Sequence, residues 1–312
     1  MSYHEYDREK QPEEYQKQQN WEIGFGLQAA DHLTPSKYLV ELSKDNIEGK
    51  KDYQEIEKEI HKYYAEKQED KRTMEADVSA IRISEILASD AFTFNPGTLK
   101  SYHRRLFQGI PEFTFKVGEY RKVNITKSEL ILAGNTVNYS DYQDIEETLN
   151  WDFTQEATKQ YQNMNQNQIV KSVTTFISGI WQIHPFREGN TRTSAVFLIK
   201  YLRSLGFPLD NEPFSENSLY FRDALVLDNA TLQYKNSDFI DKFMANTVLG
   251  ETNDLSAREM FLDQIVKRTP EIASAELIQQ LNELTINDEQ KLAKILALEG
   301  EKKEQFLKST FG

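Results

Sequence analysis

The sequence predicts a mostly α-helical protein that carries one β-hairpin. Apolar residues recur at helical spacing along most of the 312 residues. The segment 120–140 is different: it is rich in Val, Ile, Leu and Tyr around Ala133-Gly134-Asn135, which is typical of two strands joined by a turn. No internal repeat is evident, and the length suits one large domain or two modest ones.

The composition is that of a soluble globular protein and argues against several classes of function. Hydrophobic residues make up 38% and charged residues 28% of the chain. The net charge of −13 disfavours nucleic acid as a partner, because broad binding needs a basic face that displaces counterions from phosphates. The absence of cysteine excludes disulfides, thiolate metal sites and cysteine nucleophiles, and it suits a reducing compartment.

The N-terminal segment is polar and charged. Residues 1–20 are polar, so no secretory signal peptide is predicted, and we expect disorder or a frayed helix there. No stretch approaches the roughly 18 apolar residues that span a bilayer. We therefore expect a cytoplasmic protein without a membrane partner; a contact-dependent or type IV route into another cell needs no such signal and stays open.

Helices separated by short breaks are expected in the N-terminal third. Ser36 follows a proline and precedes an apolar pattern, which is typical of a capped helix start. The Lys- and Glu-rich stretch 50–72 is typical of a solvated helix face. The predicted helices are 36–48, 53–64, 74–87 and 99–107.

Two largely buried helices are expected to flank a central loop. Apolar positions at helical spacing fill 169–183 and 191–205, with a proline after the first and a glycine after the second. More helix is expected up to about residue 249. These patterns divide the chain into a helical N-terminal region over 1–65, a core domain over 74–250 and a polar helical extension over 251–312.

The loop between these two helices has the residues of a phosphoryl- or nucleotidyl-transfer site. It reads His184-Pro185-Phe186-Arg187-Glu188-Gly189-Asn190-Thr191-Arg192. Free backbone amides at a helix N-terminus attract anions, so the amides at 189–191 can hold a phosphate. Arg192 can add a charge-assisted contact to the same anion.

Two other side chains of this loop supply acid–base and metal chemistry. Glu188 offers a hard oxygen ligand, and Mg²⁺ in proteins usually takes one or two carboxylates together with substrate phosphates. His184 can be neutral near pH 7 and accept the proton of an incoming hydroxyl. Phe186 is expected to hold the loop against the core, and His103, beside two arginines, to lie at a solvated helix end.

The loop resembles the signature of the Fic family, His-Pro-Phe-x-Asp/Glu-Gly-Asn-Gly/Lys-Arg. A chance match of this quality in a chain of this length is on the order of one in a million. The resemblance covers about residues 74–250 and implies a Fic domain there, with a helical core and the hairpin as a flap. Most members of that family transfer AMP from Mg·ATP to a Ser, Thr or Tyr hydroxyl of a target protein, which can include the enzyme itself.

The resemblance also implies roles for the matched residues. His184 would be the general base and Glu188 the Mg²⁺ ligand. The residues implied to bind the nucleotide are Gly189, Asn190, Thr191, Arg192 and Tyr220.

The predicted hairpin at 123–138 would be the flap that holds a segment of the target protein by strand addition. Its apolar residues implied to dock the target are Val123, Ile125, Leu130 and Leu132.

Two departures from the family pattern leave the transferred group open. Thr191 stands where the family has Gly or Lys, and Ala195 stands where AMP-transferring members usually carry a second arginine that holds the γ-phosphate. The phosphorylating Doc branch also lacks that arginine, so phosphotransfer is an alternative. Gly189 favours AMP transfer. A third hypothesis is a non-catalytic interaction protein with the Fic fold.

Regulation by a partner or by the chain itself is a further expectation. Residues 33–64 resemble part of the small helical antitoxins that partner some Fic toxins. Such inhibitors use Ser/Thr-x-x-x-Glu-Gly/Asn, of which the chain has no clean copy: Glu48 lacks the upstream hydroxyl residue, and Glu289 is followed by Gln290. The target protein and the oligomeric state do not follow from the sequence.

Overall fold

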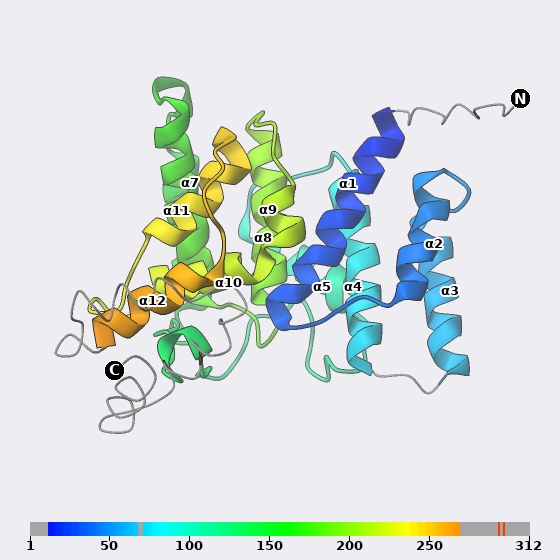
Figure 1. Cartoon of the computed structure of the whole chain (residues 1–312), viewed down its shortest axis with the longest axis horizontal. Coiled ribbons are helices and arrows are strands. Elements are labelled where there is room, and N and C mark those ends of the chain that lie inside the picture. The colour runs from blue at the N-terminus through cyan, green and yellow to red at the C-terminus, as the bar shows by residue number, and fades with distance from the viewer. Residues whose placement is uncertain (1–11, 68–70, 269–292, 294–295, 297–312) are drawn as a thin grey trace, which may run out of the picture.

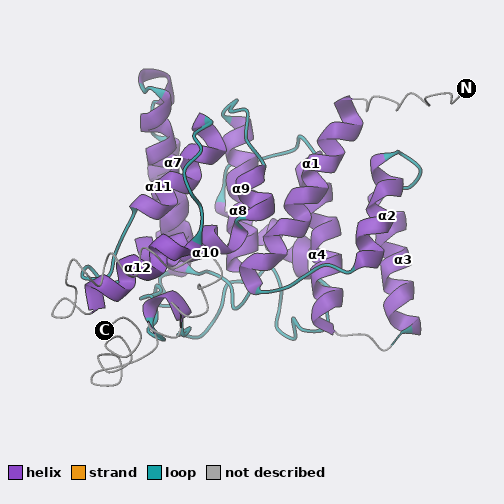
Figure 2. Cartoon of the chain, in the orientation of Figure 1, coloured by secondary structure: helices purple, strands orange, loops and turns teal. Residues whose placement is uncertain are grey.

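The computed structural model describes residues 12–67, 71–268, 293 and 296. Within them every regular element is a helix, and Figure 2 shows these helices joined by loops. The predicted mostly α-helical fold is confirmed. The longer helices are α1 (Pro12–Gly26), α2 (Lys37–Ile47), α3 (Tyr53–Glu66), α4 (Lys71–Ala88), α5 (Pro96–Phe107), α6 (Ile145–Ala157), α7 (Gln166–Ile183), α8 (Asn190–Ser204), α9 (Glu212–Glu216), α10 (Ser218–Asp228), α11 (Asp238–Met244) and α12 (Ala257–Arg268). The 3₁₀ helices are η1 (Leu27–Asp31), η2 (Leu130–Leu132) and η3 (Tyr161–Asn163), and η4 (Ala245–Leu249) is a π-helix.

Helix α1 is part of the core. Trp21 and Ile23 are buried, and α1 packs along α4, as Figure 1 shows. The expected disorder or fraying of 1–20 is therefore wrong from Pro12 onward, because burial of the apolar residues in its second half stabilises the helix. Residues 1–11 lie outside the described residues.

Helices α2 and α3 form an antiparallel pair at one end of the molecule (Figure 1). The predicted cap is confirmed: the Ser36 hydroxyl accepts a hydrogen bond from the Leu39 amide at 3.0 Å. Ser36 also donates its hydroxyl hydrogen to Asp77 of α4 at 2.6 Å. The cap of α2 is thus tied to α4, which orients the α2–α3 pair on α4.

The centre of the fold is a row of helices in which α4 contacts α5, α5 contacts α8, α8 contacts α7 and α7 contacts α6. Aromatic side chains of α6, α7 and α8 pack together with Phe94, which precedes α5. The residues of this group are Phe94, Phe153, Phe176, Phe197 and Tyr201. This packing fixes α7 relative to α8 and so positions the loop that joins them.

The predicted β-hairpin at 123–138 is not confirmed, since the described residues of this segment contain no strand. The chain does reverse direction here: the Glu129 amide donates to the Asn135 carbonyl at 2.9 Å, and the Gly134 amide donates to the Glu129 carbonyl at 2.9 Å. Ile131 and Leu132 are buried within η2, which contacts α10 and α12. The apolar residues that suggested strands anchor a loop instead.

The predicted division of the chain at residues 65, 74 and 250 stays a prediction. The N-terminal region is in contact with the rest of the fold, because η1 packs against both α8 and α10. Of the expected C-terminal extension, α12 is described, whereas most of 269–312 lies outside the described residues. Among the described helices, none combines the length and the apolar character needed to cross a bilayer.

Candidate functional site

The loop 184–189 joins α7 to α8 through two left-handed residues. His184 has φ 52° and ends α7, and Gly189 has φ 74° and begins α8. The side chain of Asn190, the first residue of α8, closes the loop, because it accepts a hydrogen bond from the Phe186 amide at 2.9 Å and donates one to the Phe186 carbonyl at 2.8 Å. The side chain of Asn190 is therefore occupied with loop geometry, and only its backbone amide is placed to meet an anion.

Glycine is required at position 189 for two reasons. Its positive φ is one that other residues adopt only with strain. In addition, a Cβ atom there would lie 2.4 Å from the ring of Phe107, which is buried in α5. The conformation that opens the N-terminus of α8 therefore depends on the absence of a side chain.

His103 of α5 holds the loop by a hydrogen bond to its backbone. Its Nδ1 accepts a hydrogen bond from the Gly118 amide at 2.8 Å, so Nε2 carries the hydrogen and donates it to the Glu188 carbonyl at 3.0 Å. Burial lowers the pKa of His103 to about 4, and its ring stacks on Phe186 at 4.0 Å. The expected solvated position of His103 is wrong, whereas the expected anchoring by Phe186, which is 1% exposed, is confirmed.

Arg121 holds the other side of the loop, a role that no sequence motif predicted. Its Nε donates to the His184 carbonyl at 2.8 Å, and its backbone amide donates to the Pro185 carbonyl at 2.9 Å. A second guanidinium nitrogen donates to the Ser140 carbonyl. These contacts fix the segment that leads into 123–138 against the residue predicted to be the base.

The imidazole of His184 is neutral, and its tautomer is defined. Its Nδ1 lies 3.2 Å from the Trp181 carbonyl, which can only accept, so Nδ1 carries the hydrogen and Nε2 keeps its lone pair. Burial lowers the pKa of His184 to about 3. The ring is 6% exposed and is covered by Tyr139, whose ring centre lies 4.2 Å away. A hydroxyl must therefore displace part of this cover to reach Nε2.

A cavity of about 510 Å³ lies beside the loop. Its lining residues are Ala30, Asp31, His32, Leu33, Arg72, Glu75, Glu112, Phe113, Lys127, Ser128, Glu129, Leu130, Glu188, Arg192 and Arg222. They come from η1 and the two residues after it, α4, the connection that follows α5, the segment 123–138, the loop, α8 and α10, so the cavity lies where the N-terminal region meets the core. Four cationic side chains and five carboxylates line it. By its own charges the cavity does not attract a polyphosphate unless a further cation is present.

The carboxylate of Glu188 faces this cavity and is in no ion pair with the described residues. Partial burial raises its pKa, and the nearby carboxylates of Asp31 and Glu75 add to that effect while Lys127 opposes it. Within the described chain no group of three or more His, Asp or Glu side chains is arranged to hold a metal ion. One free carboxylate next to a cavity does fit Mg²⁺, which completes its shell with phosphate oxygens and water.

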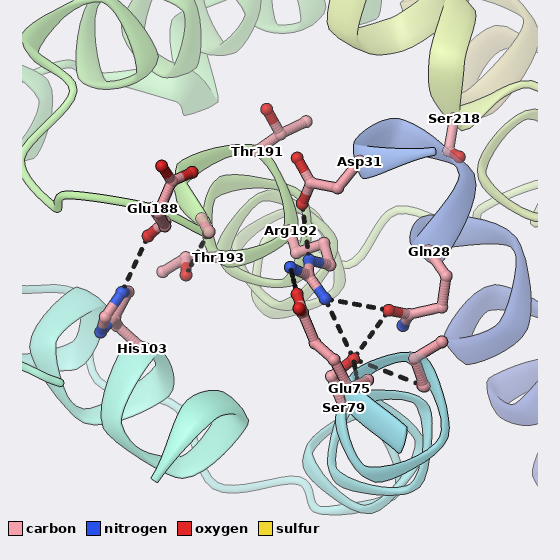
Figure 3. A network of polar contacts seen from close by, with 12 residues as sticks. Gln28, Asp31, Glu75, Ser79, His103, Glu188, Thr191, Arg192, Thr193 and Ser218 are labelled. Carbon is pink, nitrogen blue, oxygen red and sulfur yellow. Dashed lines mark hydrogen bonds and ion pairs between the residues drawn. The ribbon is translucent and has the colours of Figure 1, made fainter. Parts of the chain in front are cut away.

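Arg192 lies in a network of polar contacts that Figure 3 shows. Its side chain is 2% exposed. One terminal nitrogen pairs with Glu75 at 2.5 Å, and the other donates to Gln28 at 3.0 Å and to Ser79 at 3.1 Å. Its Nε lies 2.7 Å from Oδ2 of Asp31, close enough for an ion pair but not aligned for a hydrogen bond.

This network leaves the guanidinium of Arg192 little capacity for a phosphate. Burial alone would raise the pKa of Asp31, but Arg192, Lys127 and Arg222 hold it below its ordinary value, so Asp31 is charged. Two carboxylates thus face one arginine. The predicted nucleotide-binding role of Arg192 stays a prediction, and it requires that the phosphate compete with Asp31 and Glu75.

Of the predicted nucleotide-binding residues, Arg192 lines the cavity, whereas Gly189, Asn190, Thr191 and Tyr220 do not. The Thr191 hydroxyl accepts from Trp181 Nε1 at 3.0 Å, so its side chain points back to α7 and its amide remains for an anion. Tyr220 is buried against Phe239 and Phe243, each with its ring centre 6.4 Å away. The structure does not bring Tyr220 together with the loop.

The four apolar residues predicted to dock a target are in different environments. Val123 and Leu130 are 51% and 57% exposed, Ile125 is half-buried, and Leu132 is buried in the core. Leu130 also lines the cavity. An exposed docking surface can therefore include Val123, Ile125 and Leu130, while Leu132 anchors the segment.

Comparison with known proteins adds two findings. Residues 93–202, which run from the start of α5 into α8 and include the loop, match the model of the Fic/DOC family. The chain is also 31% identical over 129 residues to the Sinorhizobium fredii (strain NBRC 101917 / NGR234) protein named "Probable protein adenylyltransferase y4lH". That alignment covers 41% of this chain and 61% of the relative's own length.

Proposed function

We propose, from the premise that residues 93–202 form a Fic/DOC family domain, that the protein transfers AMP from Mg·ATP to a hydroxyl of a target protein. The observation that supports this most strongly is the loop itself. It combines a neutral histidine of fixed tautomer with an unpaired carboxylate that faces a 510 Å³ cavity. The name of the Sinorhizobium fredii relative agrees with this activity.

In the proposed reaction the oxygen of a Ser, Thr or Tyr hydroxyl attacks the α-phosphorus of ATP. The bond between the α-phosphorus and the oxygen that bridges to the β-phosphate breaks, and pyrophosphate leaves. The hydroxyl proton passes to Nε2 of His184, which is free because Nδ1 carries the hydrogen that faces the Trp181 carbonyl. The amides at the N-terminus of α8 stabilise the charge on the α-phosphate.

Glu188 is the proposed Mg²⁺ ligand. When bound, Mg²⁺ would neutralise phosphate charge, which a cavity with one more carboxylate than cationic side chains requires.

Phosphotransfer is the second candidate, and position 195 favours it. Residue 195 is an alanine that is fully buried in α8. The arginine that holds the γ-phosphate in AMP-transferring members is therefore absent from this position. A nucleotide bound in the reverse direction would bring its γ-phosphate to His184 and would phosphorylate the target. The two reactions leave different groups on the same hydroxyl.

Mass spectrometry of modified peptides tests the proposal. The purified protein is incubated with Mg·ATP, alone and with a bacterial lysate, and Ser, Thr and Tyr residues are searched for added AMP and for added phosphate. We expect AMP adducts that depend on Mg²⁺. Phosphate adducts instead would establish the second candidate, and no adduct of either kind would oppose a transferase.

Glu188→Gln is expected to weaken Mg²⁺-dependent ATP binding by at least about tenfold, because a neutral amide replaces the charged oxygen ligand. Binding of ATP measured in EDTA should change little. Glu112→Gln is the matched control, since Glu112 lines the same cavity outside the loop. An equal loss of binding with and without Mg²⁺ would show that Glu188 is structural.

The target hydroxyl, a small antitoxin and a self-inhibitory segment are the proposed partners. Glu48 is the candidate inhibitory glutamate that lies within the described residues. It caps the end of α2 and does not line the cavity. Glu289 lies outside the described residues. The carboxylates that pair with Arg192 beside the cavity are Asp31 of the N-terminal region and Glu75 of α4.

A further inference from the structure

Most of the cationic side chains that line the cavity are already held by partners. Arg192 pairs with Glu75 and Asp31. Arg222 pairs with Glu129 and, at 2.9 Å, with Asp223. An arginine enclosed by two carboxylates has its charge and most of its hydrogens committed, so it contributes little to the capture of an added anion.

Arg72 is also engaged, and it reaches the cavity from its edge. Its guanidinium donates to the backbone carbonyl of Asp31 at 3.1 Å. That contact fastens the start of α4 to η1, near the side chain that pairs with Arg192. Its role in the described structure is thus to hold the N-terminal wall of the cavity.

Lys127 differs from these arginines. It is half-buried, it lines the cavity, and its ammonium has no hydrogen bond or ion pair with the residues that the structure describes. Its backbone is fixed, because the Lys127 amide donates to the Thr136 hydroxyl at 3.1 Å. A free cation on a held backbone, in a cavity otherwise rich in paired charges, is suited to bind an anion that is not part of the chain.

Lys127 and Glu188 line the same cavity, and Glu188 belongs to the loop that begins at His184. An anion that Lys127 binds in this cavity therefore shares it with the carboxylate of Glu188, the proposed Mg²⁺ ligand.

We propose that Lys127 binds the terminal phosphate of the nucleotide triphosphate and supplies the cationic contact that Ala195 cannot make. This inference rests on the proposed function for the identity of the nucleotide, and on the cavity for the anion site itself. Position 195 is fully buried, and two of the three cavity arginines are paired with carboxylates. The phosphate contact thus comes from the segment 123–138 instead of from α8.

Calorimetric titration of the full chain, in buffer that contains Mg²⁺, with inorganic triphosphate, ATP and adenosine tests this site. Lys127→Met is expected to weaken binding of triphosphate and of Mg·ATP by about tenfold or more, the scale of one charge-assisted contact. Adenosine affinity should stay within about threefold, because adenosine carries no phosphate. Lys127→Arg should restore most of the triphosphate affinity.

Lys122→Met is the matched control. Lys122 is an exposed lysine on the same stretch of chain, and it lines a different surface depression, next to Tyr142. Its replacement should leave all three affinities unchanged. Thermal unfolding of each variant shows that differences in binding do not come from loss of the fold.

Three results would overturn the inference: unchanged triphosphate affinity in Lys127→Met, an equal loss for adenosine, or no binding of triphosphate to the unmodified protein. These results are separable from failure of the proposed function. If ATP never labels a protein but triphosphate binding depends on Lys127, the proposed transfer is wrong and the anion site stands. If AMP transfer occurs and Lys127→Met binds triphosphate normally, only the present inference is wrong.

Discussion

His184→Asn is expected to lower AMP transfer by at least about 100-fold, the usual scale for removal of a general base. Asparagine is the suitable replacement because residue 184 has φ 52°, a conformation that asparagine tolerates better than alanine. Nucleotide affinity and the thermal unfolding temperature should stay close to those of the unmodified protein. A folded His184→Asn variant with near-normal transfer would show that another group accepts the proton.

The pH dependence of transfer gives an independent check on the same histidine. Burial lowers the pKa of His184 to about 3, so the free enzyme keeps the imidazole neutral throughout the range from pH 8 to pH 5. We expect no loss of kcat/KM near pH 6.5 from protonation of the base, whereas an exposed histidine would lose activity there.

Arg192→Met is expected to reduce the free energy of unfolding by about 3 kcal/mol, because it leaves two carboxylates in a largely buried site without their cation. The side chains of Asp31 and Glu75 are 21% and 11% exposed, so solvent reduces the free-energy cost of leaving them unpaired. Chemical denaturation measures the loss. Asp31→Asn and Glu75→Gln, added to Arg192→Met, should recover much of the stability.

Arg203→Met on the same helix is the matched control for this comparison. Among the described residues, Arg203 donates to the Leu87 carbonyl at 3.0 Å and to the Asn20 side chain at 3.3 Å, and it contacts no carboxylate. In the Arg203→Met variant, where Arg192 is still present, Asp31→Asn and Glu75→Gln should lower the stability further, because they leave Arg192 without its carboxylate partners. If Arg192→Met costs no more stability than Arg203→Met, the ion network is not what holds the N-terminal region on α8.

Periodicity and motif spacing predicted the parts of the site that are local in sequence. The ends of α7 and α8, the loop between them and the anchoring of Phe186 all follow from residues within a few positions of one another. The partners of Arg192 do not: Glu75 lies 117 residues away along the chain, and no local pattern in α4 marks it. Such contacts are set by the packing of whole helices.

The unconfirmed hairpin and the wrong placement of His103 have different physical causes. The apolar residues of 123–138 suggested strands, but Ile131 and Leu132 are buried by a short helical turn that a left-handed Ala133 ends. His103 was expected at a solvated position because two arginines follow it. Helical spacing from Leu99 and Phe107 places it on the buried face, and that signal was present in the sequence.

The position of the label in ATP tests the central proposal most directly. Incubation of the protein, with Mg²⁺ and a target lysate, uses ATP labelled either at the α-phosphate or at the γ-phosphate, with His184→Asn as the blank. AMP transfer predicts that the α-label becomes covalently bound to protein and that the γ-label leaves in pyrophosphate. Protein labelled only from the γ-position would contradict AMP transfer and would establish phosphotransfer in its place.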